Sequence, residues 1–209
     1  MERGKHFQSN RRTRSHLDAL SELIGKHGLT ALLRLAGLQG WIDHPPPHDD
    51  AFGVDFADMA ALSATLEGMY GPHGGRALGA RVGRALFRAE QAQIEADLEP
   101  VDAAFKAQPA SARVNGVLHA VAKATRRHTH SDVEVEEKEG AFLVHVKPCP
   151  LCWGIREADH PICHSTTGFL QQAIEWIGAG DDYRVEEVSC ATIRPGEEDA
   201  CVFAVIRLQ

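Results

Sequence analysis

Residues 133–154 read VEVEEKEGAFLVHVKPCPLCWG, and this stretch decides the fold of the C-terminal half of the chain. In 133–136 valine alternates with glutamate, and in 142–147 Phe, Val and Val recur at every second position. A period of two is typical of strands with one buried face, and the Lys-Glu-Gly segment at 138–140 is turn-like. The stretch therefore predicts a β-hairpin that leads directly into a pair of cysteines.

The sequence after the cysteine pair predicts one helix and two more strands. Residues 165–177 combine a capping Ser or Thr with apolar positions at helical spacing. The segments 183–193 and 201–208 have the composition of strands, and Pro-Gly at 195–196 forms a turn between them. The C-terminal part, 129–209, is therefore expected to run β-β-α-β-β.

The first half of the chain has the apolar spacing of helices rather than strands. The expected helices cover 15–38 (with a break at Gly25–Gly28), 55–69 with Asp55 as its N-cap, 76–97 and 111–127. We expect an α+β fold in which this helical part, 15–128, packs on the antiparallel sheet. Residues 15–209 are thus predicted to form one domain.

Residues 1–14 differ from the rest of the chain in charge. They carry five basic residues against Glu2 alone, whereas the whole chain has a net charge of -7. We expect a disordered, solvated basic arm here. Because the body is acidic and has no basic stripe, nucleic acid is not an expected partner.

Composition and termini limit the cellular setting. The chain has 209 residues, of which 44% are hydrophobic and 24% charged, as in globular proteins. No apolar run approaches the ~20 residues of a membrane span, and the N-terminus leads into no apolar core of a signal peptide. We expect a cytoplasmic protein whose thiols stay reduced.

Three glycines recur every four residues at the start of the third expected helix: Gly75, which directly precedes it, Gly79 and Gly83. Such a smooth stripe allows another helix to approach closely. The stripe serves either packing within the fold or a dimer seam, and we predict a homodimer.

All five cysteines lie between Cys149 and Cys201. The pair Cys149-Pro-Leu-Cys152 has a spacing common to zinc and iron–sulfur ligation, and it also fits a dithiol redox pair. An odd number of cysteines suits metal ligands or free thiols better than a disulfide framework. We therefore expect a metal site in this part of the chain.

The other three cysteines, Cys163, Cys190 and Cys201, need one carboxylate or imidazole to complete a tetrahedral zinc site. The residues in range by sequence are Glu186, Glu187, His160 and His164. In an unbroken strand Glu187 and Cys190 face opposite sides, because their separation is odd. If both bind one metal, a bulge or a strand end must lie between them.

Several motifs in order carry a family resemblance. Cys149-Pro-Leu-Cys152-Trp-Gly, Pro161-Ile-Cys163-His, Thr167-Gly-Phe-Leu170, Val185-Glu-Glu-Val-Ser-Cys190 and Cys201-Val-Phe203 resemble the 4-vinyl reductase domain, also called hydrocarbon-binding protein. The resemblance covers about residues 110–209, and a weaker one, through residues 66–71 and 81–84, extends over about 25–105.

The resemblance implies an α+β fold shared with vesicle-tethering TRAPP subunits and related to haem-type nitric-oxide sensors. The same domain senses phenolic compounds in bacterial regulators, where three cysteines and a glutamate hold a zinc. Carried over, these ligands fall on Cys163, Glu187, Cys190 and Cys201. The pair Cys149 and Cys152 has no counterpart in that set, and it stays a candidate for a second metal site or a redox pair.

The leading functional hypothesis is a sensor or carrier that binds a small hydrophobic or aromatic molecule between the helical layer and the sheet. The zinc would be structural, because four protein ligands leave no open position for water. No catalytic residue is predicted. The candidate pocket residues are aromatic: Phe87, Phe105, Phe142, Trp153, Phe169 and Trp176.

Two alternatives belong to other functional classes. One is an enzyme or accessory factor that acts on a tetrapyrrole vinyl group or a similar ligand, with Cys149 and Cys152 as redox or iron–sulfur ligands. The chain shows no nucleotide, flavin or catalytic-triad signature, which disfavours catalysis. The other alternative is a scaffold or tether without a ligand, as in TRAPP subunits.

Overall fold

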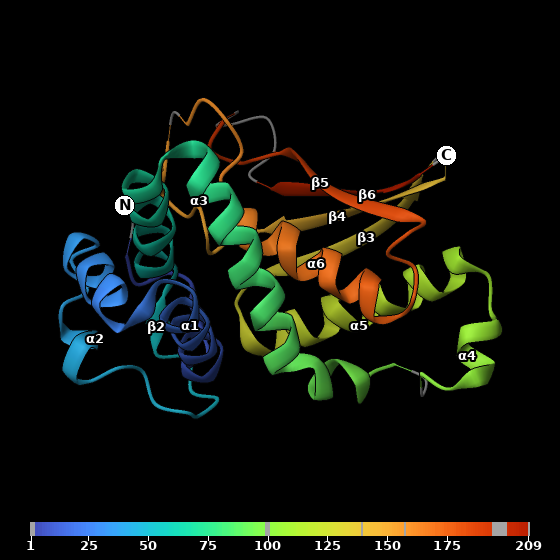
Figure 1. The fold of residues 1–209 in the computed structure, drawn as a ribbon, viewed down its shortest axis with the longest axis horizontal. Coiled ribbons are helices and arrows are strands. Elements are labelled where there is room, and N and C mark those ends of the chain that lie inside the picture. The colour runs from blue at the N-terminus through green and yellow to red at the C-terminus, as the bar shows by residue number, and fades with distance from the viewer. Residues whose placement is uncertain (1–2, 99–100, 139, 157, 194–199, 209) are drawn as a thin grey trace.

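A four-stranded antiparallel sheet forms the C-terminal half of the protein. The computed structural model describes residues 3–98, 101–138, 140–156, 158–193 and 200–208. The strands of this sheet are β3 (Asp132–Lys138), β4 (Ala141–Lys147), β5 (Tyr183–Ser189) and β6 (Cys201–Arg207), in the order β3-β4-β6-β5. Helices α5 (Ala110–His128) and α6 (His164–Trp176) lie along one face of it (Figure 1).

The predicted hairpin is confirmed by the pairing of β3 with β4. Val133 lies opposite Val146 and Val135 opposite Val144 in the antiparallel register. Val133, Val144 and Val146 are buried beneath the helices, whereas most of their neighbours in β3 are exposed glutamates. The alternation in the sequence thus corresponds to one face against the core and one toward solvent.

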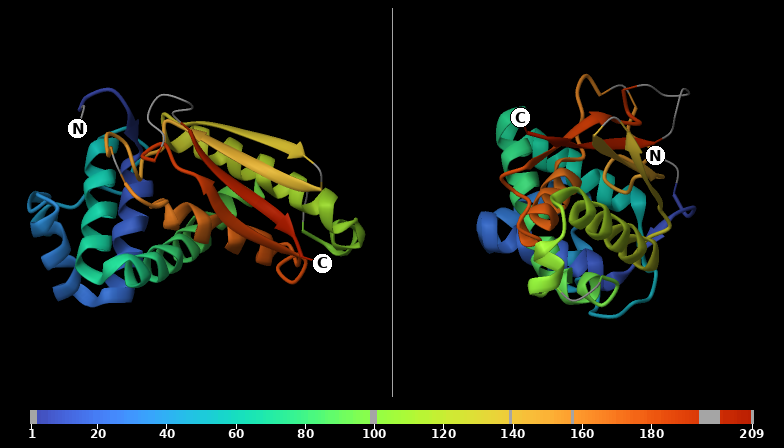
Figure 2. Two further views of the ribbon diagram at one scale, coloured as in Figure 1. Left: turned by 90° about the horizontal axis from the view of Figure 1, so that it is seen from above. Right: turned by 90° about the vertical axis from the view of Figure 1, so that its right-hand side faces the viewer.

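The first helices of the chain lie at one end of the molecule, beyond the sheet (Figure 2). The elements that precede the sheet are β1 (Phe7–Gln8), α1 (Asn10–Leu35), α2 (Gly40–Asp43), β2 (Val54–Asp55), α3 (Phe56–Glu95) and α4 (Ala103–Ala107). The end of the molecule consists of α1, α2 and the first part of α3, and the pair β1-β2 joins the N-terminal segment to the start of α3. Among the described residues, none of the helices combines the length and apolar character of a membrane span.

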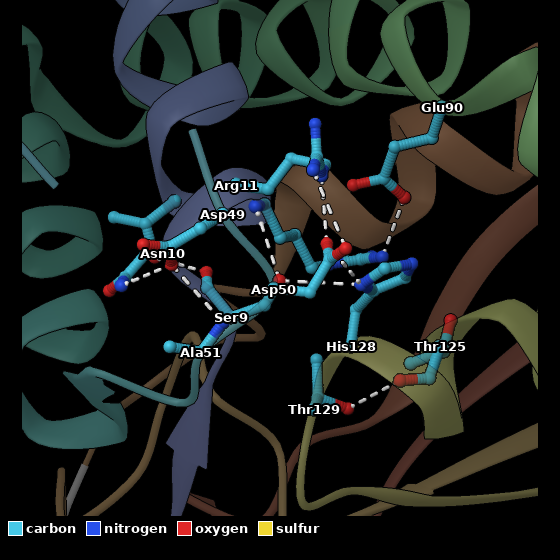
Figure 3. Close-up of polar contacts among 12 residues, drawn as sticks. Ser9, Asn10, Arg11, Asp49, Asp50, Ala51, Glu90, Thr125, His128 and Thr129 are labelled. Carbon is cyan, nitrogen blue, oxygen red and sulfur yellow. Dashed lines mark hydrogen bonds and ion pairs between the residues drawn. The ribbon is translucent and has the colours of Figure 1, made fainter. Parts of the chain in front are cut away.

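The prediction of a disordered arm over residues 1–14 is wrong for the residues that the structure describes. Phe7 and Gln8 pair with β2, and Ser9 caps α1 by accepting a hydrogen bond from the N–H of Arg12. Basic side chains of this segment have acidic partners: Arg11 forms an ion pair with Asp50 (Figure 3), and Arg12 forms one with Glu90. Long-range ion pairs and strand pairing of this kind leave no signal in the local charge pattern.

Two long helices bend at glycines with positive φ. Gly25 bends α1 at φ 73°, as its position in the sequence predicted. Gly71 bends α3 at φ 70°, and Pro72 follows where a new helical segment begins. Asp55 caps α3 as expected, accepting a hydrogen bond from the N–H of Ala57 at 2.8 Å.

The glycine stripe serves packing within the chain. A Cβ on Gly83 would lie 1.9 Å from the carbonyl oxygen of Ser165, and a Cβ on Gly168 would lie 2.0 Å from that of Ala80. Helices α3 and α6 therefore touch backbone to backbone. Because α6 packs against Gly79 and Gly83, these glycines are not free to form a dimer seam. The homodimer stays a prediction.

Candidate metal centre and ligand cavity

The five cysteines converge at one end of the sheet, and all are buried and free of disulfides. The Sγ atoms of Cys149 and Cys163 lie 3.5 Å apart, those of Cys152 and Cys201 3.4 Å, and those of Cys163 and Cys201 3.6 Å. Cys190 Sγ lies 3.9 Å from Cys163 Sγ and 3.8 Å from Cys201 Sγ. The pair that the sequence left unassigned therefore belongs to the same cluster as the other three.

Each thiol is positioned by the end of a regular element. Cys149 and Cys152 lie in the loop that follows β4, and Cys163 immediately precedes α6. Cys190 follows the last residue of β5, and Cys201 is the first residue of β6. Because these segments are held by the sheet and by α6, the fold brings together sulfur atoms up to 52 positions apart in the sequence.

Glu187 joins the cluster through an irregularity in β5. The register between β5 and β6 shifts between Glu187 and Ser189, and the strand ends before Cys190. This is the break that the odd separation of Glu187 and Cys190 required. Candidate ligand atoms of Cys163, Glu187, Cys190 and Cys201 lie within 4.8 Å of one another.

The donor atoms fit a tetrahedral ion. A Zn–S bond of ~2.3 Å places two sulfur ligands about 3.8 Å apart, close to the observed spacings. Burial, followed by charge on Cys190, raises the pKa of the Glu187 carboxyl to about 10. Hydrogen bonds from Cys152 and then Cys163 lower the pKa of the Cys190 thiol to about 6. A cation would replace the protons that such a cluster otherwise shares.

A second feature is a cavity of about 60 Å³ between the helices and the sheet. Its apolar wall comes from α3, α5, α6 and the inner face of β3 and β4. Its polar wall includes Arg12 and His16 of α1 and the hydroxyl groups of Thr129 and Ser131. The loop between the first two cysteines also contributes, through Pro150 and Leu151.

Of the six aromatic residues predicted for a pocket, Phe169 lines this cavity and the other five do not. Phe87 and Trp176 pack with Phe169 as neighbouring rings, and Phe142 packs near Tyr183. Phe105 is buried in the main core, and Trp153 makes an edge contact with His6. Periodicity identifies which side of an element is buried, but not which buried side chains border a void.

The polar wall contains buried charge that the sequence analysis missed. Arg12 Nη1 lies 2.6 Å from Glu90 Oε2, and the guanidinium lies 5.3 Å from the centroid of the Phe169 ring. Burial, followed by the charge of Arg12, lowers the pKa of His16 to about 4, so this imidazole is neutral at pH 7. The signal available in the sequence was Glu90 itself, which interrupts an apolar stripe between Leu86 and Ile94.

Comparisons with known proteins bear on the fold. No protein-family model and no curated protein matches the chain. A single-residue mutant of the H-NOX protein from T. tengcongensis is 12% identical with a TM-score of 0.58, over 94% of this chain and 96% of that one.

Two other solved structures span similar lengths. The Fe(II) unliganded H-NOX protein from K. algicida is 12% identical with a TM-score of 0.51, over 96% of this chain and 97% of that one. A TRAPP complex subunit 3 from Naegleria fowleri, covalently bound to palmitic acid, is 15% identical with a TM-score of 0.44, over 94% and 96%. The predicted α+β architecture is confirmed, and this chain shares its fold with the H-NOX proteins.

Proposed function

We propose that this chain is a sensor or carrier of the 4-vinyl reductase type, which binds a small molecule beside a structural zinc centre. The observation that carries the proposal is the cavity between helices and sheet, where apolar walls face the buried group of Arg12, Glu90 and His16. A mostly apolar concavity with few convergent polar groups is the usual form of a ligand site. A tether without ligand has no need of such a void.

The composition of the walls indicates the class of ligand. Leu86, Val144 and Phe169 offer apolar contact, which suits an aromatic ring or a short hydrocarbon. Arg12 supplies N–H donors, and the neutral His16 offers one donor and one acceptor. We infer a small amphipathic molecule, such as a phenol, whose apolar body lies against the sheet and whose polar group lies near α1.

The size of the cavity limits the ligand further. About 60 Å³ is several times what one water requires by the same measure, ~10–15 Å³. It is too small for a porphyrin macrocycle, so the residues do not fit a haem. The proposal therefore includes neither haem nor a tetrapyrrole substrate.

The zinc centre has a structural role in this proposal. A tetrahedral ion with four protein ligands holds those ligands in place and leaves no position for a reacting water. With Cys163, Glu187, Cys190 and Cys201 as its ligands, it would connect the start of α6 with the end of β5 and the start of β6. The cavity lies beside this centre, because Ser165 and Thr166 at the start of α6 line it.

Ligand binding is tested by calorimetric titration of the zinc-loaded full chain with phenol, p-cresol and octanoate. Thr166 lines the cavity whereas Thr167, the next residue of α6, does not. Thr166→Leu is expected to weaken binding of the preferred probe about tenfold, a loss of ~1.4 kcal/mol. Thr167→Leu is the matched control and should bind as the wild type does. Equal affinities for both variants, or no binding of any probe to the wild type, would contradict the proposal.

A further inference from the structure

The metal ligands form two overlapping groups rather than one. Cys149, Cys152, Cys163 and Cys201 have their sulfur atoms within 4.8 Å of one another, and so do the donor atoms of Cys163, Glu187, Cys190 and Cys201. Cys163 and Cys201 belong to both groups. Of the six donors, four therefore surround a shared pair of sulfur atoms.

One tetrahedral ion cannot use all six donors, because it accepts four. The shared Sγ atoms, of Cys163 and Cys201, lie 3.6 Å apart. On one side the Sγ of Cys149 lies 3.5 Å from that of Cys163, and the Sγ of Cys152 lies 3.4 Å from that of Cys201. On the other side Cys190 lies 3.9 Å and 3.8 Å from the same two sulfur atoms. Both sides thus have spacings near the ~3.8 Å edge of a zinc–thiolate tetrahedron.

Each side also has a reason of its own to bind a cation. Glu187 Oε1 is buried without a hydrogen-bond partner among the described residues, although Oε2 accepts a hydrogen bond from the N–H of Cys163 at 2.9 Å. A buried carboxylate oxygen without a partner is costly unless a cation or a proton compensates it. On the opposite side Cys149 and Cys152 are both at most 3% exposed, and their spacing is that of a metal-binding pair. Two buried thiolates need a cation to compensate their charge.

We propose that the cluster holds two divalent ions bridged by the thiolates of Cys163 and Cys201. The first ion is completed by Cys149 and Cys152, and the second by Glu187 and Cys190. Five thiolates and one carboxylate carry six negative charges, so two divalent ions leave a net charge of -2. The alternative is one divalent ion bound by four anionic ligands, which also leaves a net charge of -2. The two donors that do not bind this ion then stay protonated and neutral.

The inference rests on the proposed function only in treating the cysteines as a zinc site, and the ligand cavity does not enter it. Native mass spectrometry of the zinc-loaded full chain counts the ions per chain. We expect two in the wild type, and one after Cys149→Ser or Glu187→Gln, each of which removes a ligand from one side. Thr192→Val is the control, because Thr192 Oγ1 donates to Cys190 Sγ at 3.2 Å without being a ligand, and it should keep two.

A second measurement does not depend on variants that fold. The wild type reconstituted with ¹¹³Cd should give two ¹¹³Cd resonances of equal intensity, one from an all-sulfur site and one from a site with an oxygen ligand. One ion and one resonance would overturn the two-ion centre and leave the structural zinc of the proposed function intact. No bound ion would overturn both the two-ion centre and that zinc, while phenol binding would still be measured separately.

Discussion

Arg12 Nη1 lies 2.6 Å from Glu90 Oε2, and the two side chains are only 13% and 7% exposed. This ion pair connects α1 to the second part of α3, and Arg12 lines the cavity. Burial raises the pKa of the Glu90 carboxyl, and the charge of Arg12 offsets part of this rise. The ionised form of Glu90 is therefore stabilised by Arg12. The N-terminal segment is thus attached to the main core by charge as well as by strand pairing.

Removing Arg12 should destabilise the protein because it leaves the Glu90 carboxyl buried and unpaired. Arg12→Met is expected to lower the free energy of unfolding by about 3 kcal/mol at pH 7. Arg14→Met is the control, since Arg14 pairs with Asp18 on the exposed side of the same helix, and it should change stability by less than ~0.5 kcal/mol. Urea unfolding measures both. Equal midpoints for the two variants would show that the ion pair contributes nothing.

The double variant Arg12→Met with Glu90→Met separates the charge from the packing. Because both buried charges disappear together, we expect stability within about 1–2 kcal/mol of the wild type. Phenol binding should nevertheless be lost, since the donor at the polar wall is gone. Retained binding in a stable double variant would exclude Arg12 from the ligand site.

His16 should make the protein less stable in acid. Its folded-state pKa of about 4 lies below the usual 6.5, so the stabilisation is present above pH 6.5 and is lost as the pH falls toward 4. Between pH 7 and pH 5 this one group should cost about 2 kcal/mol. His16→Gln, which does not titrate, should show a correspondingly smaller loss over the same range. Metal release and Glu90 affect both proteins alike, so identical pH profiles would refute the assignment to His16.

Gly83→Ala should separate α3 from α6. The added Cβ would lie 1.9 Å from the Ser165 carbonyl oxygen, which forces a backbone shift worth about 2–3 kcal/mol. Gly68→Ala in the same helix meets no atom within 4 Å and should gain up to ~1 kcal/mol from helix propensity. Thermal denaturation of the two alanine variants should therefore move in opposite directions. A stable Gly83→Ala protein would mean that the helices are not in backbone contact.

Metal removal should loosen one end of the sheet and leave α1 unchanged. After treatment with a zinc chelator, amide hydrogen exchange over residues 149–163 and 187–192 should accelerate by about tenfold or more, equivalent to ~1.4 kcal/mol of local stability. The amides around Leu17 and Leu20 belong to a separate apolar cluster and should keep their protection. Uniform acceleration over the whole chain would instead indicate that the metal supports global folding.

Local patterns predicted much of the fold. The hairpin from Asp132 to Lys147 was evident because its alternation reports one buried face. The capping of α3 by Asp55 and the bend at Gly25 followed from single residues whose backbone preferences are strong. The last strands were placed correctly, although β5 ends at Ser189 rather than at Ile193. The turn predicted at 195–196 lies outside the described residues.

The candidate site was harder to predict because it depends on contacts between distant segments. Glu187 and Cys190 are an odd number of residues apart, so the sequence predicted a break in the strand between them if both bind one metal. The structure has that break. Spacing in the sequence could not predict that Cys149 and Cys152 lie beside Cys163 and Cys201. Their position depends on the path of the loop between β4 and α6. The polar wall at Arg12 was missed because a run of basic residues carries no information about a distant carboxylate.

Pro150 and Leu151 line the cavity while the residues on either side of them, Cys149 and Cys152, belong to the cysteine cluster. If an ion fixes this loop as proposed, a molecule that packs against Pro150 and Leu151 would bind more tightly to the metal-loaded protein. Thermodynamic reciprocity then requires that the same molecule raise the affinity of the protein for the metal by an equal free energy. An effector and an ion that never touch would thus report on each other through two residues of backbone.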